Sequence, residues 1–374
     1  MTRTFLHSFD PPSASPVNAA TVDLDVADIE DAGIREVLQT PGAAYGAWSI
    51  LDALLTPTGV GTPFVFREPL GQAREVKVAL SGLFGRFVAR AYLERYFNLS
   101  IFAHLGSQTI DLDRRRKVKI KRLSRGDLPD WIACASDLSS LTVAEAKGCH
   151  DPGGPAKALT RAWAQAGRID VTAQGRKVTV KRIAIATRWG MAVAGPADAH
   201  LSVKDPLDEG ESIEPHEKDA LFIGILRLHI ANMIRPLGHA ELAGALYRLT
   251  QQPFARRLQG DLDLARAALD AAPVGEVDKT TAIGGLVGGI VTRAGPVTDA
   301  DVTPGDQESL ARLNLRPVFV GVERELIQAA IDADPQAVRT RIAQSVRPDD
   351  FARPDRAGGW IVPLGERRHI IGGA

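Results

Sequence analysis

Cysteine is nearly absent from this chain. The 374 residues include two cysteines, Cys134 and Cys149, and neither belongs to a CxxC pair or to a Cys/His cluster. A disulfide framework and a cysteine-based zinc site are therefore excluded. A reducing compartment is the simpler expectation.

Long apolar runs are absent as well. No stretch of the sequence approaches the roughly 18 consecutive apolar residues that a membrane-spanning helix needs, and residues 1–16 contain no apolar core of the kind that marks a signal peptide. We therefore expect a soluble, cytoplasmic protein. The 45% hydrophobic content suffices for a sizeable core, and the length predicts two domains at roughly 150 residues each.

The chain also lacks net charge, because 45 Lys and Arg residues balance 45 Asp and Glu residues. Taken alone, this balance argues against nucleic-acid binding, which normally uses a basic domain. The zero is a cancellation, however. Residues 81–195 hold 20 Lys and Arg against 9 Asp and Glu, a net charge of +11, and the remaining residues carry −11. The positive charge is confined to one segment, where it favours binding to phosphate groups.

Composition and turn residues divide the chain into four segments. Residues 1–75 begin with prolines and acidic residues and predict an N-terminal arm with a helical lead-in. Residues 76–195 predict a helix, short strands, a second helix and a further strand. Residues 196–219 are acidic and predict a linker. Residues 220–374 predict a mainly helical C-terminal domain of unknown role. Its glycine-rich residues 282–292 favour a buried strand over a phosphate-binding loop, because no Lys-Ser/Thr pair follows the glycines.

The most informative part of the sequence predicts a β-hairpin. Two apolar segments, residues 131–135 and 141–146, flank a turn rich in serine. Pairing of these segments brings Asp130 beside Glu145 and Lys147, on strands about 4.8 Å apart. Glu145 and Lys147 are two residues apart and leave the same face of their strand.

Two carboxylates and an ammonium group on an otherwise apolar hairpin are costly to bury. The arrangement is stable if Asp130 and Glu145 hold a cation and Lys147 faces an anionic partner. Oxygen ligands with open water positions suit Mg²⁺ or Mn²⁺ bound together with a substrate phosphate. The alternative is a turn position for Asp130 and a solvent-exposed pair of Glu145 and Lys147.

These residues resemble the motif of the PD-(D/E)xK phosphodiesterases, the restriction-endonuclease-like superfamily. Pro129 and Asp130 match its PD element, and Glu145, Ala146 and Lys147 match its (D/E)xK element. The resemblance implies metal-dependent hydrolysis of phosphodiester bonds in nucleic acid. It assigns the metal to Asp130, Glu145 and the backbone carbonyl of Ala146. It also implies that Lys147 orients or helps deprotonate the attacking water and stabilises the transition state.

The resemblance covers roughly residues 76–194 and implies an α/β fold with an αβββαβ core, a mixed sheet flanked by helices. The helix before the sheet carries Glu94, which could supply a further metal-binding acid or simply form a surface salt bridge. The helix after the motif carries Gln165 as a further catalytic residue, and residues 178–186 form the next strand. The RecB-like branch of the family often has Tyr four residues after such a Gln, whereas this chain has Ile169.

Basic residues precede the motif directly. Eight of the twelve residues 114–125 are Lys or Arg, none is acidic, and their alternation with apolar residues predicts a strand with one cationic face. Two further basic residues share one face of the helix near residues 154–168. Either group could bind the phosphate backbone or form an ordinary solvated surface. The residues expected to contact nucleic acid are Arg114, Arg115, Arg116, Lys117, Lys119, Lys121, Lys157 and Arg161.

The sequence thus predicts a Mg²⁺-dependent nuclease that cleaves DNA, with RNA as an alternative substrate. Phage defence, restriction or DNA repair would suit such an enzyme. The alternative from another class is a non-catalytic nucleic-acid-binding or assembly subunit that retains the nuclease fold as a scaffold. The C-terminal domain could support a homodimer or bind a partner protein.

Overall fold

The structure is a computed structural model, and it places most of the chain. The described residues are 2–17, 19–40, 62–63, 74–105, 110–113, 118–150, 153–190, 198–206, 215–250, 255–272, 274–278, 281–292, 295–297, 318–344, 353–354 and 359–363. None of the helices in these ranges has the length and apolar character that a membrane crossing requires.

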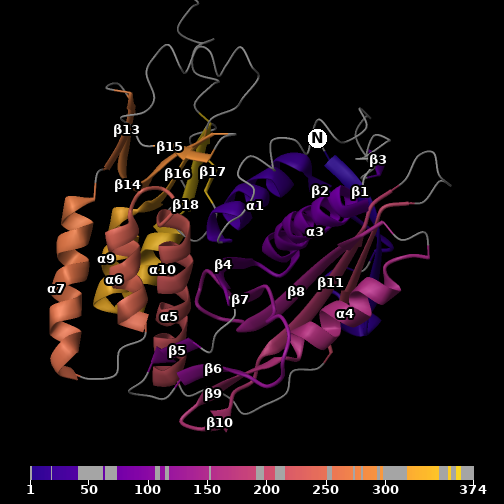
Figure 1. The fold of residues 1–374 in the computed structure, drawn as a ribbon, viewed down its shortest axis with the longest axis horizontal. Coiled ribbons are helices and arrows are strands. Elements are labelled where there is room, and N and C mark those ends of the chain that lie inside the picture. The colour runs from indigo at the N-terminus through magenta and orange to yellow at the C-terminus, as the bar shows by residue number, and fades with distance from the viewer. Residues whose placement is uncertain are drawn as a thin grey trace, which may run out of the picture.

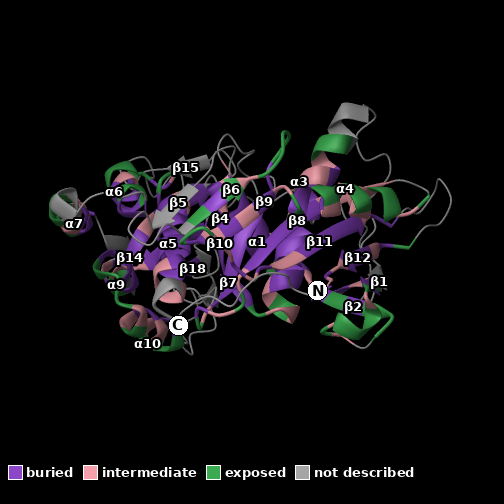
Figure 2. Cartoon of the chain, turned by 90° about the horizontal axis from the view of Figure 1, so that it is seen from below, coloured by how far each residue is buried: buried purple, intermediate pink, exposed green. Residues whose placement is uncertain are grey.

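A mixed eight-stranded sheet forms the centre of the N-terminal half (Figure 1). Its strands β8 and β11 run parallel, whereas β7 and β4 continue the sheet in antiparallel fashion. Both central strands are largely buried, as expected of strands covered on both faces (Figure 2). In spatial order the strands are β2 (Thr21–Asp25), β1 (Thr2–Asp10), β12 (His200–Lys204), β11 (Lys181–Arg188), β8 (Thr142–Cys149), β7 (Trp131–Ala135) and β4 (Leu99–His104), with β3 (Thr62–Pro63) also paired to β1.

Helices cover both faces of this sheet. Helices α1 (Val26–Gln39) and α3 (Arg74–Tyr96) pack together, and α3 lies against β8 and β11. Helix α4 (Ala156–Ala166) packs on the same two strands from the opposite side (Figure 1). The expected helix before the sheet, which carries Glu94, and the helix near residues 154–168 are confirmed as α3 and α4. An α/β fold with a mixed sheet flanked by helices is confirmed as well. A short 3-10 helix, η1 (Pro12–Ala14), follows β1.

A second, four-stranded antiparallel sheet holds the basic segment. Its strands are β10 (Arg176–Lys177), β9 (Ile169–Ala173), β6 (Val118–Arg122) and β5 (Ile110–Asp113). On β6, Ile120 is buried, whereas Lys119 and Lys121 are exposed. The predicted strand with one cationic face is therefore confirmed over residues 118–122.

The C-terminal half is mixed α/β, which corrects the expectation of a mainly helical domain. Its helices are α5 (Pro215–Ile234), α6 (Ala240–Thr250), α7 (Ala255–Ala271), α9 (Arg324–Asp332) and α10 (Pro335–Gln344). They accompany a six-stranded sheet of β13 (Val274–Asp278), β14 (Thr281–Thr292), β15 (Gly295–Val297), β16 (Val318–Glu323), β17 (Arg353–Pro354) and β18 (Gly359–Pro363). The strand predicted at residues 282–292 is confirmed as β14. The strands β15, β17 and β18 of the same sheet are too short to stand out in the sequence.

Two expected segment boundaries also differ from the structure. Strand β1 belongs to the main sheet, so the beginning of the segment 1–75 is not a loose arm. Strand β12 lies inside the expected linker 196–219, runs parallel to β1 and places Leu201 and Val203 in the core. Polar residues interrupt the apolar ones in both strands, and nearby prolines and acidic residues mask that pattern.

The two halves share one hydrophobic core. Buried apolar residues form a single cluster that extends from β1 and α3 through α5 to β16 and α9. Helix α5 makes this connection, since it packs against β4 and α1 on one side and against α6 and α9 on the other. The C-terminal half is therefore packed directly against the elements that surround the candidate site.

Candidate active site

The β7–β8 hairpin brings the two motif carboxylates together. Trp131 pairs with Ala144, which places Asp130 directly across from Glu145. The backbone N–H of Asp130 donates to Glu145 Oε2 at 2.9 Å, and the N–H of Ala146 donates to Asp130 Oδ2 at 2.9 Å. The predicted hairpin and the juxtaposition of Asp130 and Glu145 are confirmed, with a register one residue from the expected one.

Lys147 completes this group from the same strand. Its Nζ forms an ion pair with Glu145 Oε1. The Glu145 side chain is 0% exposed, whereas the Lys147 side chain is 36% exposed. Lys147 therefore forms an ion pair with the buried carboxylate, and its ammonium group remains accessible to solvent or substrate.

A close helix–strand contact fixes the orientation of these side chains. A Cβ on Gly148 would lie 1.7 Å from the Ser81 carbonyl oxygen on α3, and a Cβ on Gly85 would lie 2.5 Å from the Gly148 backbone nitrogen. Gly148 therefore faces α3. Because side chains alternate along a strand, Glu145 and Lys147 face the opposite side, where α4 packs.

Burial makes the negative charge of this pair unfavourable. Burial, together with the neighbouring Asp130 carboxylate, raises the pKa of Glu145 to about 9 against the opposing effect of Lys147. Burial likewise raises the pKa of Asp130, although Arg86 opposes the shift. A nearby divalent cation reverses this preference, because it stabilises the ionised carboxylates.

The donor set fits a hard divalent cation held only in part by protein. Within the described ranges, no three His, Cys, Asp or Glu side chains form a group able to hold a metal ion. Asp130 and Glu145 nevertheless supply carboxylate oxygens on adjacent strands. Mg²⁺ commonly binds through one or two carboxylates, with water and substrate phosphate as its other ligands. The pair therefore suits Mg²⁺ or Mn²⁺. The expected binding of the metal by the backbone carbonyl of Ala146 stays a prediction.

Glu94 does not belong to this pair, which corrects a sequence-based expectation. Its two carboxylate oxygens contact Arg35 at 2.6 Å and Arg90 at 3.0 Å. Along α3, Glu94 lies eight residues beyond Arg86, the α3 residue that reaches Asp130, and this separation is about 12 Å. Glu94 is therefore not part of the carboxylate pair.

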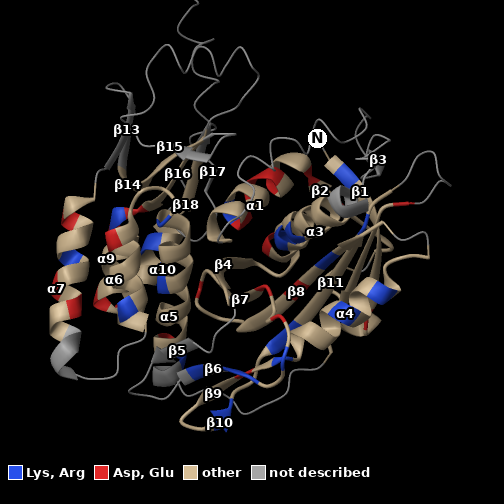
Figure 3. Ribbon diagram, in the orientation of Figure 1, with Lys and Arg blue, Asp and Glu red and all other residues tan. Residues whose placement is uncertain are grey.

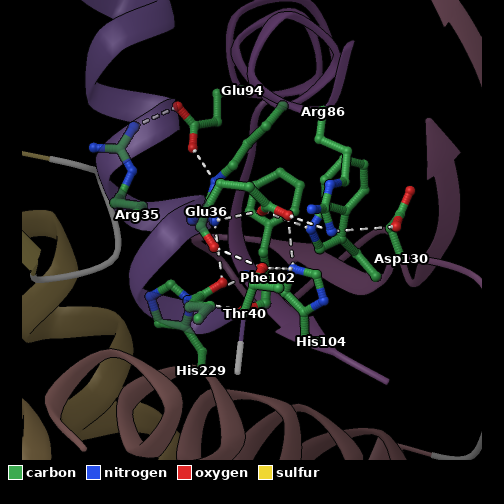
Figure 4. Close-up of polar contacts among 12 residues, drawn as sticks. Arg35, Glu36, Thr40, Arg86, Glu94, Phe102, His104, Asp130 and His229 are labelled. Carbon is green, nitrogen blue, oxygen red and sulfur yellow. Dashed lines mark hydrogen bonds and ion pairs between the residues drawn. The ribbon is translucent and has the colours of Figure 1, made fainter. Parts of the chain in front are cut away.

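The acid that approaches the site is instead Glu36 of α1 (Figure 4). Its fully buried carboxylate contacts His104 Nε2 at 2.8 Å and Trp131 Nε1 at 2.9 Å. Arg86 and Arg90 each place Nη1 3.5 Å from it. Burial alone would raise the pKa of Glu36, but these cationic partners outweigh burial and lower it to about 2.

Sequence reasoning missed Glu36, although a signal exists. Residues 34–38 read Ile-Arg-Glu-Val-Leu, so a charged pair interrupts an apolar helical segment. All five of these residues are buried. A buried acid in an apolar helix requires partners from elsewhere in the fold, but the sequence does not identify them.

Acid should weaken the fold by protonating Glu36. The folded-state pKa of about 2 lies below the usual value of 4.5. Its stabilising contribution is therefore complete above about pH 4.5 and is lost as the pH falls towards 2. Urea unfolding of the wild type and of Glu36→Gln should show a difference that shrinks between pH 5.5 and pH 3. A difference that does not change with pH would contradict this assignment.

The polar network continues from Glu36 to the C-terminal half. Arg90 donates to Gln39 Oε1 at 3.0 Å, and Gln39 Nε2 lies 2.9 Å from His229 Nδ1 on α5. Figure 4 shows His229 at the edge of this cluster, below Glu36 and Thr40. Helix α5 thus contacts the buried polar network around Glu36 directly.

Gln165 positions the motif loop, and its expected catalytic role stays a prediction. Its side chain is buried, and Nε2 donates to the Leu128 carbonyl at 2.7 Å. Arg168 donates to the Asp127 carbonyl at 2.9 Å. These contacts fasten the chain that leads into Asp130. In contrast, Lys157 and Arg161 on α4 are exposed.

The remaining site predictions fall partly outside the described residues. Arg114, Arg115, Arg116 and Lys117 lie there, so their expected contacts with nucleic acid stay predictions. Lys119 and Lys121 are exposed on β6. The chain matches no protein-family model, no curated protein and no solved structure.

Proposed function

We propose that this chain is a metal-dependent nuclease that hydrolyses phosphodiester bonds in DNA. The observation that carries the proposal is the meeting of Asp130, Glu145 and Lys147 at the end of the β7–β8 hairpin. A buried pair of acids beside a partly exposed lysine is suited to binding a cation together with a phosphate. An ordinary surface pair would not place Glu145 in the core.

The order of elements supports the same proposal. Helix α3, strands β4, β7 and β8, helix α4 and strand β11 follow one another in the αβββαβ order of the PD-(D/E)xK superfamily. Strand β11 lies parallel to β8, beside the motif residues. Strands β5, β6, β9 and β10 interrupt this order but form the separate four-stranded sheet.

The residues of the site have distinct parts in such a hydrolysis. Asp130 and Glu145 would hold Mg²⁺ or Mn²⁺, which when bound acts as a Lewis acid towards the phosphate oxygens. Lys147 has three N–H donors, which can orient the attacking water and stabilise negative charge on the phosphate. Gln165 keeps the Leu128–Asp130 segment in place through the Leu128 carbonyl.

The four-stranded sheet offers a surface for the phosphate backbone. Across its strands, Lys119 of β6 pairs with Thr172 of β9, which in turn pairs with Lys177 of β10. Directly paired residues share a face of a sheet, so Lys177 lies on the same face as Lys119 and Lys121, where its Nζ pairs with Asp170 Oδ1 at 3.2 Å. Figure 3 shows basic residues along β6 and at β10. The sequence-based prediction did not include Lys177.

Removing this cationic face should weaken nucleic-acid binding for every sequence alike. The triple variant Lys119→Ala, Lys121→Ala and Lys177→Ala should flatten the plot of log affinity against log salt by about 0.9 per lost phosphate contact. Fluorescence anisotropy between 50 and 200 mM salt measures this slope.

A matched control removes three positive charges from helices of the C-terminal half, with the substitutions Arg248→Ala, Arg266→Ala and Arg341→Ala. These arginines form ion pairs within or between those helices. The control should keep the wild-type slope. An unchanged slope in the lysine variant would remove the four-stranded sheet from the interface.

The proposed function is tested with short duplex DNA, single-stranded DNA and RNA. Wild type, Asp130→Asn and Glu145→Gln are purified in parallel and incubated with each substrate in Mg²⁺, Mn²⁺ or EDTA. We expect wild type to cleave DNA with either metal, and both variants to be inactive. Cleavage of RNA alone would change the substrate class. Binding without cleavage in every condition would favour the non-catalytic subunit.

A further inference from the structure

Arg86 lies between the two buried acidic centres of the site. From α3, its Nη1 lies 3.5 Å from Glu36 Oε1 and 3.8 Å from Asp130 Oδ1. Figure 4 shows its guanidinium group between Glu36 and Asp130. Both distances exceed those of a typical N–H···O hydrogen bond. Arg86 is therefore attracted to both carboxylates without being held tightly by either.

Arg90, one helical turn further along α3, has the contacts of a purely structural arginine. Its Nε contacts Glu94 at 3.0 Å, its Nη1 contacts Gln39 at 3.0 Å, and its guanidinium group lies 4.6 Å from the Phe102 ring centre. The Arg90 side chain is 0% exposed, whereas that of Arg86 is 24% exposed. Both arginines contact Glu36, but of the two only Arg86 is partly exposed and lies next to Asp130.

Two accessible cationic groups consequently flank the carboxylate pair. Lys147 contacts Glu145 and Arg86 contacts Asp130, so each acid has one partly exposed cation beside it. A divalent cation on the carboxylates would reduce their attraction for both groups. The positive charge left beside the pair then requires an anionic occupant, and a guanidinium group binds phosphate through parallel N–H donors.

We propose that Arg86 is a further catalytic residue, which donates hydrogen bonds to a non-bridging oxygen of the scissile phosphate, while Glu36 is the positioning residue that orients it. The inference rests on the proposed nuclease function. It adds a phosphate-binding group from α3, opposite the side from which Lys147 acts. The buried Glu36, fixed by His104 and Trp131, supplies a rigid anchor for the guanidinium group.

The test compares Arg86→Ala, Arg86→Lys and the control Arg95→Ala in single-turnover cleavage at saturating DNA. Arg95 lies on the same helix, is exposed and pairs with the exposed Asp28. We expect Arg86→Ala to lose about 10²- to 10³-fold in rate, as removal of one transition-state donor does. Arg86→Lys should recover only part of this loss, because an ammonium group lacks the planar fork. Arg95→Ala should cleave as wild type does.

Chemical rescue separates this role from a structural one. Methylguanidine should restore part of the cleavage by Arg86→Ala and should leave wild type and Arg95→Ala unchanged. If Arg86→Ala does not fold, Arg86→Lys must still show the loss at wild-type stability in urea. Wild-type cleavage that Arg86→Ala or a folded Arg86→Lys retains in full would overturn the role of Arg86 alone. Absence of cleavage by wild type would overturn the proposed function and this role with it.

Discussion

Lys147→Ala should lower the cleavage rate at saturating DNA by about 10²- to 10³-fold, the usual effect of removing one group that stabilises the transition state. The ammonium group is partly exposed and lies at the carboxylate pair. Its loss removes the donors for water and phosphate. It also removes the favourable charge beside Glu145, whose pKa burial already raises to about 9.

Lys218→Ala is the matched control for this measurement. Lys218 lies on α5, and its ammonium group lies 5.7 Å from the centre of the Phe222 ring. The control should cleave at the wild-type rate. Quenched single-turnover reactions at several Mg²⁺ concentrations separate slower chemistry from weaker cation binding. A Lys147→Ala protein that cleaves as fast as the control would refute the role of the lysine.

Glu36→Ala should reduce the free energy of unfolding by about 3–5 kcal/mol, the usual cost of removing one partner of a buried ion pair. The substitution leaves the buried Arg90 without one of its two carboxylates. It also deprives Trp131 Nε1 and His104 Nε2 of an acceptor. Equilibrium unfolding in urea measures the loss.

Glu325→Ala is the control, since Glu325 is exposed and pairs only with the exposed Arg341 among the described residues. Its substitution should change the stability by at most about 0.5 kcal/mol. Glu36→Gln should fall between the two, because the amide keeps the side-chain volume and one acceptor oxygen. Equal stability of Glu36→Ala and Glu325→Ala would show that the buried network does not stabilise the fold.

Local patterns predicted the central part of the site. The alternation of apolar residues around a serine-rich turn was enough to place Asp130 beside Glu145, because a hairpin pairs residues that are close in sequence. The helices before and after the motif followed from apolar periodicity alone. Likewise, Lys119 and Lys121 could be assigned to one strand face from their spacing.

Contacts between distant segments could not be predicted in this way. Glu36 meets Trp131 across 95 positions and His229 meets Gln39 across 190. Strands β1 and β12 pair although nearly 200 residues separate them. Nothing in the local sequence of Glu94 distinguishes it from Glu36, and only the fold shows which acid approaches Arg86. The exposed face of Lys177 similarly depends on the pairing of β10 with β9.

The fold shows where the positively charged segment of the sequence lies. The segment with net charge +11 includes β6, β9, β10, α4 and the motif hairpin. These elements present Lys119, Lys121 and Lys147 to solvent. A neutral chain can therefore carry a local field that attracts phosphate groups.

Cleavage of supercoiled plasmid DNA tests the central claim most directly. Purified wild type is incubated with plasmid in Mg²⁺, then in excess EDTA, and then after Mg²⁺ is restored, with Glu145→Gln prepared identically. We expect nicked or linear plasmid in Mg²⁺, none in EDTA, recovery on restoration, and no cleavage by Glu145→Gln. Plasmid that stays supercoiled with wild type in Mg²⁺ and in Mn²⁺, or that Glu145→Gln cleaves equally well, would contradict the central claim.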